Sequence, residues 1–530
     1  MGFLLDALDQ KRFEVQRDVV KNERRQSYEN RPYGMAPMIM QPVIFPPPHP
    51  YSWMTIGSPE DLDAASVEDV KAFFQHFYSP SNSSIAIAGD IDPDEVRQLV
   101  ERYFAGIPPG PPINRTSRMD SELNGQVSLT MRDKVQLPKL YLAWPTCPLF
   151  DSEEPTLDLL SAVLGDGKSS RLYRSLVYEK QIAQDVVVYH HAQELSGDFQ
   201  IQVTASPGHT LEEIEDVVQE ELERMRCEEP NEREINRAKN RIETYHISQL
   251  EHIGGFGGRA DQLNYYNTLA GDPEIINTDL NRYLEVTSEE IQSAASSTLG
   301  KNYVKLSVFP EESLRPSNAS INRSVMPNGS SPRPFRPPIP QMVQLSNGMN
   351  VLFVNKPGLP KVAFGVLVRA GAVTDPSDKP GLAHMTASML QEGTLTRSSH
   401  DIAEELEFLG TEIRSDVARE YILLSSECLT SKWPKVLQVM ADVVRNPNFP
   451  THELERVRKE SLAGLDQIAD NPMIIASRAS RSLVYGPKTR YGHPATGNKQ
   501  SVKAMTRSEM KRHYSGHYGP ENATFIVAGE

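Results

Sequence analysis

The sequence is poor in cysteine and in positive charge. Of its 530 residues three are cysteine, Cys147, Cys227 and Cys428, an odd number that is scattered along the chain. They indicate neither a disulfide framework nor a cysteine-based zinc site, and we interpret them as small buried hydrophobic residues. The formal net charge is −15, and no basic cluster is interleaved with aromatic residues. This balance argues against nucleic acid as a partner.

Long apolar runs are absent as well. None approaches the roughly 18 consecutive residues that a membrane span requires, and the stretch VAFGVLVRAGAV is broken by Arg369. The N-terminal stretch MGFLLDALDQKRFEVQRD acquires charge too early for a signal peptide and predicts an amphipathic helix. We therefore expect no membrane span, while the composition fits cytoplasm and periplasm equally.

The chain is too long for one hydrophobic core, and one linker divides it. Residues 309–340 are rich in Pro, Ser and Asn and lack the periodicity of a buried helix or strand. We expect two domains before this linker, 1–115 and 116–308, and a third after it, 341–530. In the second domain DFQIQVTA alternates with a period of two, which predicts a strand with one covered face and one less covered face.

The first and third domains share an internal repeat. Residues 57–90 align without a gap on residues 497–530, and eight pairs are identical, Tyr78 and Tyr518 among them. A repeat with so long a period indicates a duplicated domain rather than a solenoid. We therefore expect the two domains to have the same fold.

The helix that precedes this repeat carries a carboxylate in the first copy alone. With Arg17 matched to Arg456, Glu23 falls opposite Leu462. Glu23 also continues, at helical spacing, an apolar stripe that consists of Leu4, Leu8, Val15 and Val19. Two interpretations stay open: a carboxylate that faces inward and meets a cation, or a Glu at the edge of the stripe that bends to solvent.

A stretch of the third domain resembles a metal-binding helix that has lost its ligands. GLAHMTASMLQEGT, residues 381–394, would contain HxxEH if Ala387 were Glu and Ser388 were His. HxxEH is the zinc signature of the inverzincins.

Taken together, the motifs of this chain resemble the pitrilysin or insulinase-type zinc peptidases, which include mitochondrial processing peptidase. The resemblance covers nearly the whole chain and rests on RDVVKNE (17–23), NRPYG (30–34), HPY (49–51), FYSPSNSSIAIAGD (77–90), GDGKSSRLYRSL (165–176), NGMNVLFV (347–354) and GLAHMTASMLQEGT (381–394). In that family the two His of HxxEH bind zinc, the Glu between them acts as base, and a Glu on a second helix is the third ligand.

The resemblance assigns Glu23 to the position of the third zinc ligand. A second Glu is common seven residues earlier in active members, where this chain has Gln16. In the third domain His384 keeps the first ligand position, but the base, second-His and third-ligand positions hold Ala387, Ser388 and Leu462. The resemblance therefore implies a zinc-free third domain.

No HxxEH or HExxH occurs in the chain. The spacing of His384 and Leu462 would place the equivalent His of the first copy some 55 residues before Met1, and the third domain stops at Glu530 where the first copy continues. We therefore expect an interior fragment of a longer protein, or one product of a split gene, and assign no catalytic residue within it.

The resulting expectation is an α+β fold of tandem duplicated two-layer domains, each a mainly antiparallel sheet with helices on one face. Residues 1–115 would be the C-terminal part of a catalytic-type domain, and 341–530 its degenerate, shortened repeat. The resemblance implies a zinc metalloendopeptidase that hydrolyses peptides or unfolded polypeptides in a chamber, with Zn²⁺ in the intact enzyme and no tight zinc on this chain alone. The alternative is a non-catalytic scaffold subunit that pairs with a separate HxxEH-bearing chain or forms a homo-oligomer.

Overall fold

The computed structural model describes residues 8–116, 118–311, 339–356, 359–468, 471–487 and 489–529. They fall into two compact units. Unit 1 holds most of the chain up to Phe309, and unit 2 holds most of the chain from Pro310 onward. The division lies within the predicted linker, most of which falls outside the described residues. The predicted domains 1–115 and 116–308 both lie in unit 1, so their separation stays a prediction.

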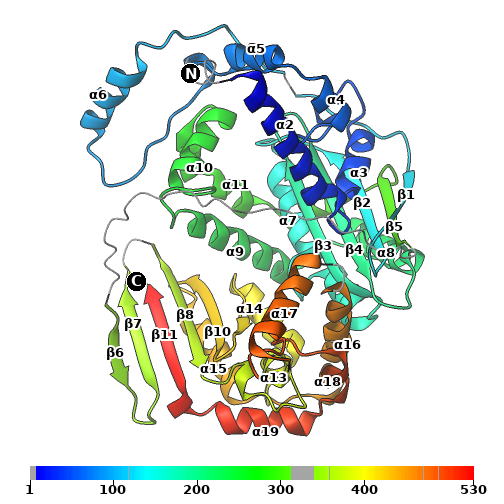
Figure 1. Ribbon diagram of the computed structural model, residues 1–530, viewed down its shortest axis with the longest axis vertical. Coiled ribbons are helices and arrows are strands. Elements are labelled where there is room, and N and C mark those ends of the chain that lie inside the picture. The colour runs from blue at the N-terminus through cyan, green and yellow to red at the C-terminus, as the bar shows by residue number, and fades with distance from the viewer. Residues whose placement is uncertain are drawn as a thin grey trace. The chain divides into compact units, whose positions relative to one another are not determined.

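Unit 1 contains a five-stranded sheet in the order β1-β5-β2-β4-β3 (Figure 1). The strands are β1 (Val127–Asp133), β2 (Lys139–Thr146), β3 (Ala183–Ala192), β4 (Gly197–Ala205) and β5 (Val304–Pro310). β2 pairs antiparallel with both β4 and β5, and β3 pairs antiparallel with β4. The mainly antiparallel sheet that the sequence predicts is confirmed.

One face of this sheet carries the main core of unit 1. Leu142, Ile201 and Val188 are paired across β2, β4 and β3 and point to this face, where they are buried. The helices that pack there include α7 (Glu154–Gly165), α8 (Leu211–Cys227) and α12 (Ser288–Thr298). The other unit 1 helices from this region are α9 (Glu232–Gln249), α10 (Arg259–Tyr265) and α11 (Asp279–Glu285). Helices packed on a sheet face confirm the predicted α+β class.

The opposite face is covered in part by the N-terminal region. Helix α3 (Ala36–Ile44) and the short helix η2 (Pro50–Ser52) lie over β2 and β5, where Met40 and Phe45 pack on Tyr141. Among the described residues, the N-terminal region also contains α2 (Gln10–Arg24), α4 (Pro59–Ala64), α5 (Val67–Phe77) and α6 (Pro93–Phe104). The uncovered half of this face, over β3 and β4, is where the candidate site lies.

Unit 2 contains a six-stranded sheet in the order β6-β7-β11-β8-β10-β9 (Figure 1). Its strands are β6 (Gln341–Gln344), β7 (Asn350–Asn355), β8 (Lys361–Val368), β9 (Arg414–Val417), β10 (Ile422–Leu429) and β11 (Ala523–Gly529). The helices of this region are α13 (Leu382–Leu390), α14 (Ser399–Phe408), α15 (Trp433–Arg445), α16 (Thr451–Gln467), α17 (Pro472–Tyr485), α18 (Lys499–Ala504) and α19 (Arg507–His517). A hairpin with Asn347-Gly348 in its turn joins β6 to β7, and Gly348 has the positive φ of 89° that such a turn requires.

The internal repeat is visible residue by residue. At the offset of the sequence alignment, α4 corresponds to α18 and α5 corresponds to α19 with the same first and last positions. Both longer helices begin with a capping box, on Ser66 in one copy and Thr506 in the other. The predicted duplication is therefore present in the local structure as well as in the sequence.

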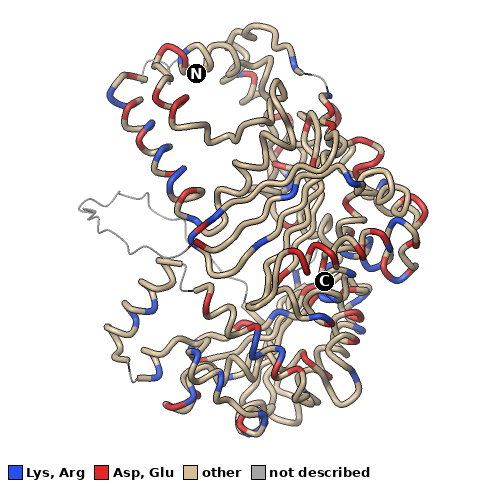
Figure 2. Tube along the Cα trace, turned by 90° about the vertical axis from the view of Figure 1, so that its right-hand side faces the viewer, with Lys and Arg blue, Asp and Glu red and all other residues tan. Residues whose placement is uncertain are grey.

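Charged residues of both signs are interspersed along the helices of both units (Figure 2).

The last segment of the repeat differs between the copies. β11 pairs with β7 in parallel and with β8 antiparallel, whereas its counterpart, residues 83–89, forms no strand. We call residues 83–89 the open segment. Its alternating isoleucines are typical of a strand, but no strand of the described part of unit 1 lies beside it, and a strand needs a neighbour to satisfy its backbone. Ile85 and Ile87 are therefore 54% and 45% exposed.

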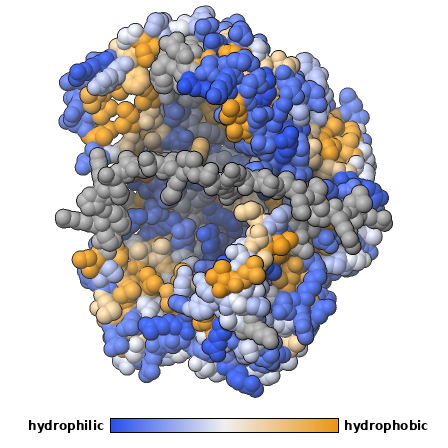
Figure 3. Space-filling model, viewed as in Figure 1, coloured by the Kyte–Doolittle hydropathy of each residue, from blue (hydrophilic) through white to orange (hydrophobic). Residues whose placement is uncertain are grey.

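Helices α5 and α6, which flank the open segment, also have exposed apolar side chains. Their exposed apolar side chains include Phe73, Phe77, Leu99, Tyr103 and Phe104. Figure 3 shows apolar surface among hydrophilic residues at the upper left, over the part of the chain where Figure 1 places α6. Within the described ranges, no helix is long and apolar enough to cross a membrane.

Helix α2 faces the opposite way from the prediction. Val15 and Val19 of the predicted inward stripe are 59% and 48% exposed, and Leu4 lies outside the described residues. Phe13 is buried instead, and Arg17 donates a hydrogen bond to the Ala65 carbonyl at 2.5 Å. Helical spacing puts Phe13 and Arg17 on the side away from the valines, so contacts to the α4 region decide which side docks. The expectation of an inward-facing apolar stripe is therefore wrong.

Candidate functional site

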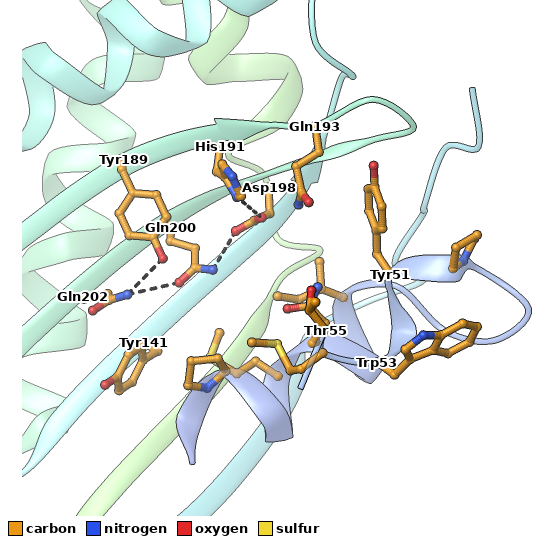
Figure 4. A pocket seen from close by; sticks show the side chains of 16 residues that line it. Tyr51, Trp53, Thr55, Tyr141, Tyr189, His191, Gln193, Asp198, Gln200 and Gln202 are labelled. Atoms are coloured by element: carbon orange, nitrogen blue, oxygen red, sulfur yellow. Dashed lines mark hydrogen bonds and ion pairs between the residues drawn. The ribbon is translucent and has the colours of Figure 1, made fainter. Parts of the chain in front are cut away.

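A cavity of about 410 Å³ lies on the half-covered sheet face of unit 1 (Figure 4). The sheet contributes one wall, and α3 with the segment around η2 contributes the other. The lining residues are Pro37, Met40, Gln41, Ile44, Pro50, Tyr51, Trp53, Met54, Thr55, Tyr141, Tyr189, His191, Gln193, Asp198, Gln200 and Gln202. Its size is within the range of ordinary ligand sites.

The alternation of β4 explains the polar wall. Asp198, Gln200 and Gln202 are two residues apart, so their side chains leave the same face of the strand. Antiparallel register places His191 opposite Asp198 and Tyr189 opposite Gln200 on β3. The residues between them, such as Phe199 and Ile201, point to the other face and are fully buried in the main core.

A row of side-chain hydrogen bonds runs along this wall (Figure 4). Gln202 Nε2 donates to the Tyr189 hydroxyl at 3.1 Å and to Gln200 Oε1 at 3.2 Å. Gln200 Nε2 in turn donates to Asp198 Oδ2 at 2.6 Å. Because Gln200 is held at both ends, it links the carboxylate to the far end of the row.

Asp198 is the carboxylate of this cavity, and 5% of the residue is exposed. Burial raises the pKa of Asp198, while the Gln200 hydrogen bond and the nearby His191 and His190 act in the opposite direction. His191 Nδ1 lies 3.9 Å from Asp198 Oδ1, which is beyond hydrogen-bonding distance. Burial likewise raises the pKa of Tyr189, so its hydroxyl keeps its proton.

The opposite wall is fixed by the HPY stretch. His49 Nδ1 accepts a hydrogen bond from the Tyr51 backbone N–H at 3.0 Å, so its Nε2–H donates to the Met119 carbonyl, 2.9 Å away. The Tyr51 hydroxyl accepts from the Leu195 N–H at 3.1 Å. The position of Tyr51 is thereby set from both ends, and Trp53, 63% exposed, stands at the same wall.

Unit 2 contains the helix pair that corresponds to a metal-binding site. α13 carries His384, Ala387 and Ser388, and α16 carries Leu462. The two helices lie against each other, with Ser461 Oγ 3.3 Å from Met385 Sδ. Burial lowers the pKa of His384, and the Ser388 hydroxyl donates to the His384 carbonyl at 3.0 Å. The structure thus places His384, Ala387 and Ser388 on one helix and Leu462 on a second helix packed against it.

Glu23 lies near the end of α2 and is exposed. None of the described residues forms a hydrogen bond or ion pair with its side chain, and it does not line the cavity of Figure 4. Among the described residues no group of three or more His, Cys, Asp or Glu could hold a metal ion. The described residues thus do not fit a zinc ion by themselves, and the role of Glu23 as a ligand stays a prediction.

Two family models match the chain, one before and one after residues 309–340. Residues 64–242 match the Peptidase M16 inactive domain, and residues 350–485 match Insulinase (Peptidase family M16). The chain belongs to peptidase family M16. The pitrilysin or insulinase-type resemblance read from the motifs is therefore confirmed.

Curated relatives of this M16 chain are named as zinc proteases. Zinc protease PqqE of Helicobacter pylori is 24% identical over 304 residues, which cover 55% of this chain and 67% of that protein. An uncharacterized zinc protease of Mycobacterium bovis is 28% identical over 204 residues, 38% of this chain and 46% of that protein. One of Rickettsia felis is 26% identical over 186 residues, 35% of this chain and 45% of that protein. The matched region thus spans about half the length of the latter two.

A solved structure has a related fold. The crystal structure of a protease from Helicobacter pylori matches with a TM-score of 0.53 at 22% identity, covering 57% of this chain and 73% of that chain. At this identity the likeness shows a shared fold alone.

Sequence reasoning missed the polar wall of the cavity. The alternation of DFQIQVTA predicts a strand with a less covered face, but it assigns no function to the residues of that face. The alternation itself was a signal, because Asp198, Gln200 and Gln202 occupy alternate positions and so share one face of the strand. What the sequence did not show is which strand lies beside β4, and hence that Tyr189 and His191 would join them.

A second missed feature is a pair of histidines four residues apart on α19. The His513 and His517 rings are 4.5 Å apart, but Gly516 stands where HxxEH has its base. His513 is buried, and its Nε2 lies 2.9 Å from the Thr374 hydroxyl. Burial, with a smaller contribution from His517, lowers the pKa of His513 to about 4.

We expect the buried His513 to make unit 2 less stable in acid. The unfolded chain gains a proton near pH 6.5 but folded His513 does not until about pH 4, so stability falls as the pH drops through this window. By pH 5 the loss should be about 2 kcal/mol. His513→Gln keeps a partner for Thr374 and should remove this loss, as measured by urea unfolding at pH 7.5 and pH 5.

The control is His252→Gln, which replaces an exposed histidine of unit 1. It should leave the difference between the two pH values unchanged. Equal pH dependence in His513→Gln and the unaltered chain would contradict the assignment.

Proposed function

We propose that this chain takes part in the zinc-dependent hydrolysis of peptides or unfolded polypeptides, as the part of an M16 peptidase that holds substrate. The observation that carries the proposal is the M16 match on both sides of residues 309–340. Relatives named as zinc proteases support a hydrolytic role for the complete assembly. The cavity over β3 and β4 supplies a place in this chain where a peptide side chain could be held.

Within this proposal Glu23 is the third zinc ligand. Its carboxylate is exposed and forms no hydrogen bond or ion pair with a described residue, so it is available to a metal. A Glu on a second helix completes a site whose two imidazoles come from HxxEH. Since the chain has no HxxEH, those imidazoles and the base would come from polypeptide outside this sequence.

The proposal is tested by the zinc content of the purified chain and by reconstitution. With one ligand of three, the chain alone should hold no stoichiometric zinc and should not cleave a quenched fluorescent peptide. Together with an HxxEH-bearing M16 polypeptide added in trans, it should gain both, and Glu23→Gln should abolish both.

The matched control is Glu68→Gln, an exposed glutamate at the start of α5, which should leave zinc content and cleavage unchanged. Tight stoichiometric zinc on the chain alone would contradict the proposed role of Glu23. So would full activity of the Glu23→Gln assembly.

A second candidate function is a non-catalytic partner or scaffold subunit, which acts with a separate HxxEH-bearing chain or as a homo-oligomer. The open segment favours it, because its counterpart in unit 2 is paired on both edges. The two candidates differ in what Glu23→Gln does in the reconstituted assembly. If the chain is a scaffold, the assembly that carries Glu23→Gln should still cleave the peptide, because only an exposed carboxylate is removed.

A further inference from the structure

We propose that the cavity of Figure 4 binds the guanidinium group of an arginine side chain in a peptide, with Asp198 as the carboxylate that receives it. This inference rests on the proposed function, because it requires a polypeptide that reaches the cavity. It adds the chemical class of residue that the site selects.

The charge of the cavity favours a cation. Asp198 lines it, whereas no lysine or arginine is among the described lining residues. A buried carboxylate is costly unless a cation or several hydrogen bonds compensate it. Asp198 Oδ2 has the Gln200 amide, but Oδ1 has no closer polar neighbour in the described contacts than His191 Nδ1 at 3.9 Å. A ligand that donates to Oδ1 would supply the missing compensation.

The hydrogen-bond row favours a ligand rich in donors. Gln200 Oε1 accepts from Gln202 Nε2 but, as a carbonyl oxygen, keeps a second lone pair. Asp198 Oδ1 is a second acceptor, two residues away on the same face of β4. A guanidinium carries five N–H donors in a fixed plane and no acceptor, whereas an ammonium is a compact charge with three. A group that must reach spaced acceptors is therefore better matched by arginine than by lysine.

The walls favour a flat cation. Tyr141 and Tyr189 on the sheet and Tyr51 on the opposite wall line the cavity with aromatic rings (Figure 4). A guanidinium plane stacks on aromatic rings while its edge makes hydrogen bonds. The cavity thus combines a carboxylate, amide acceptors and aromatic faces, which together fit this one side chain.

The test measures, by calorimetry at pH 7.5 without added metal, how tightly three end-capped pentapeptides bind to the full chain. They differ at the central residue, which is arginine, lysine or citrulline, the neutral isostere of arginine. We expect the arginine peptide to bind at least ~10-fold more tightly than the citrulline peptide, because a charge-assisted pair is lost with citrulline. Asp198→Asn should bring the arginine peptide to the citrulline level.

The control variant is Asp216→Asn, which removes one charge from an exposed position on α8 of the same unit and should change nothing. Thermal unfolding of Asp198→Asn checks that it folds, and the comparison of arginine with citrulline on the unaltered chain does not depend on any variant. Equal affinities for these two peptides, no measurable binding of any of them, or an unchanged affinity in folded Asp198→Asn would overturn the inference. Tighter binding of lysine would overturn the guanidinium assignment.

These outcomes are separate from those of the proposed function. Peptides that bind without regard to the central residue would end this inference and leave reconstituted hydrolysis untouched. Conversely, reconstitution without cleavage would end the proposed function even if the arginine peptide binds Asp198.

Discussion

Trp144→Ala should lower the free energy of unfolding of unit 1 by about 3–5 kcal/mol, as expected for removal of a buried indole. Trp144 is 1% exposed and lies on the core face of β2, where its ring contacts Phe199 and Tyr303. Its Nε1–H donates to the Gly300 carbonyl at 2.9 Å, so the substitution leaves both a void and an unpaired acceptor. Urea unfolding followed by circular dichroism measures the loss.

The same substitution at an exposed position provides the comparison. Trp53→Ala removes an indole that is 63% exposed and should change the free energy of unfolding by no more than about 0.5 kcal/mol. Similar losses in the two variants would mean that the main core is not where the β2 register places it.

Arg456→Met should destabilise unit 2 by about 3–5 kcal/mol, because it leaves buried carboxylates without their cation. Arg456 Nε donates to Glu453 Oε2 at 2.7 Å, and its Nη2 contacts Glu392. Glu453 and Glu392 are 2% and 5% exposed. Urea unfolding at pH 7.5 measures the loss.

Arg414→Met is the matched control, since Arg414 pairs with Glu412 at the surface and its side chain is 72% exposed. Its effect should stay within about 0.5 kcal/mol. A loss in Arg456→Met no larger than in Arg414→Met would show that the buried network is dispensable.

Local patterns in the sequence predicted local structure well. The gapless alignment of 57–82 with 497–522 gave two helices and a turn with the same bounds in both copies, since capping residues such as Ser66 and Thr506 act within a few residues. The period of two in DFQIQVTA likewise marked β4, because strand side chains alternate regardless of what lies beside them.

Features that depend on distant partners were predicted less well. The stripe of Val15 and Val19 is apolar, but contacts from the α4 region to Arg17 turn α2 the other way. The open segment has the composition of a strand and lacks a described neighbour. The cavity depends on strand order and on the docking of η2, so its residues were visible in the sequence while their convergence was not.

The open segment also bears on how this polypeptide behaves in solution. An extended backbone without cross-strand hydrogen bonds pairs readily with strands of other molecules, and exposed isoleucines strengthen that contact. Such pairing starts aggregation. Unlike many natural edges, Ile85 and Ile87 are separated by alanine rather than by a guarding lysine or proline. At high protein concentration we therefore expect aggregation through the open segment. A strand that paired with the open segment would suppress this aggregation.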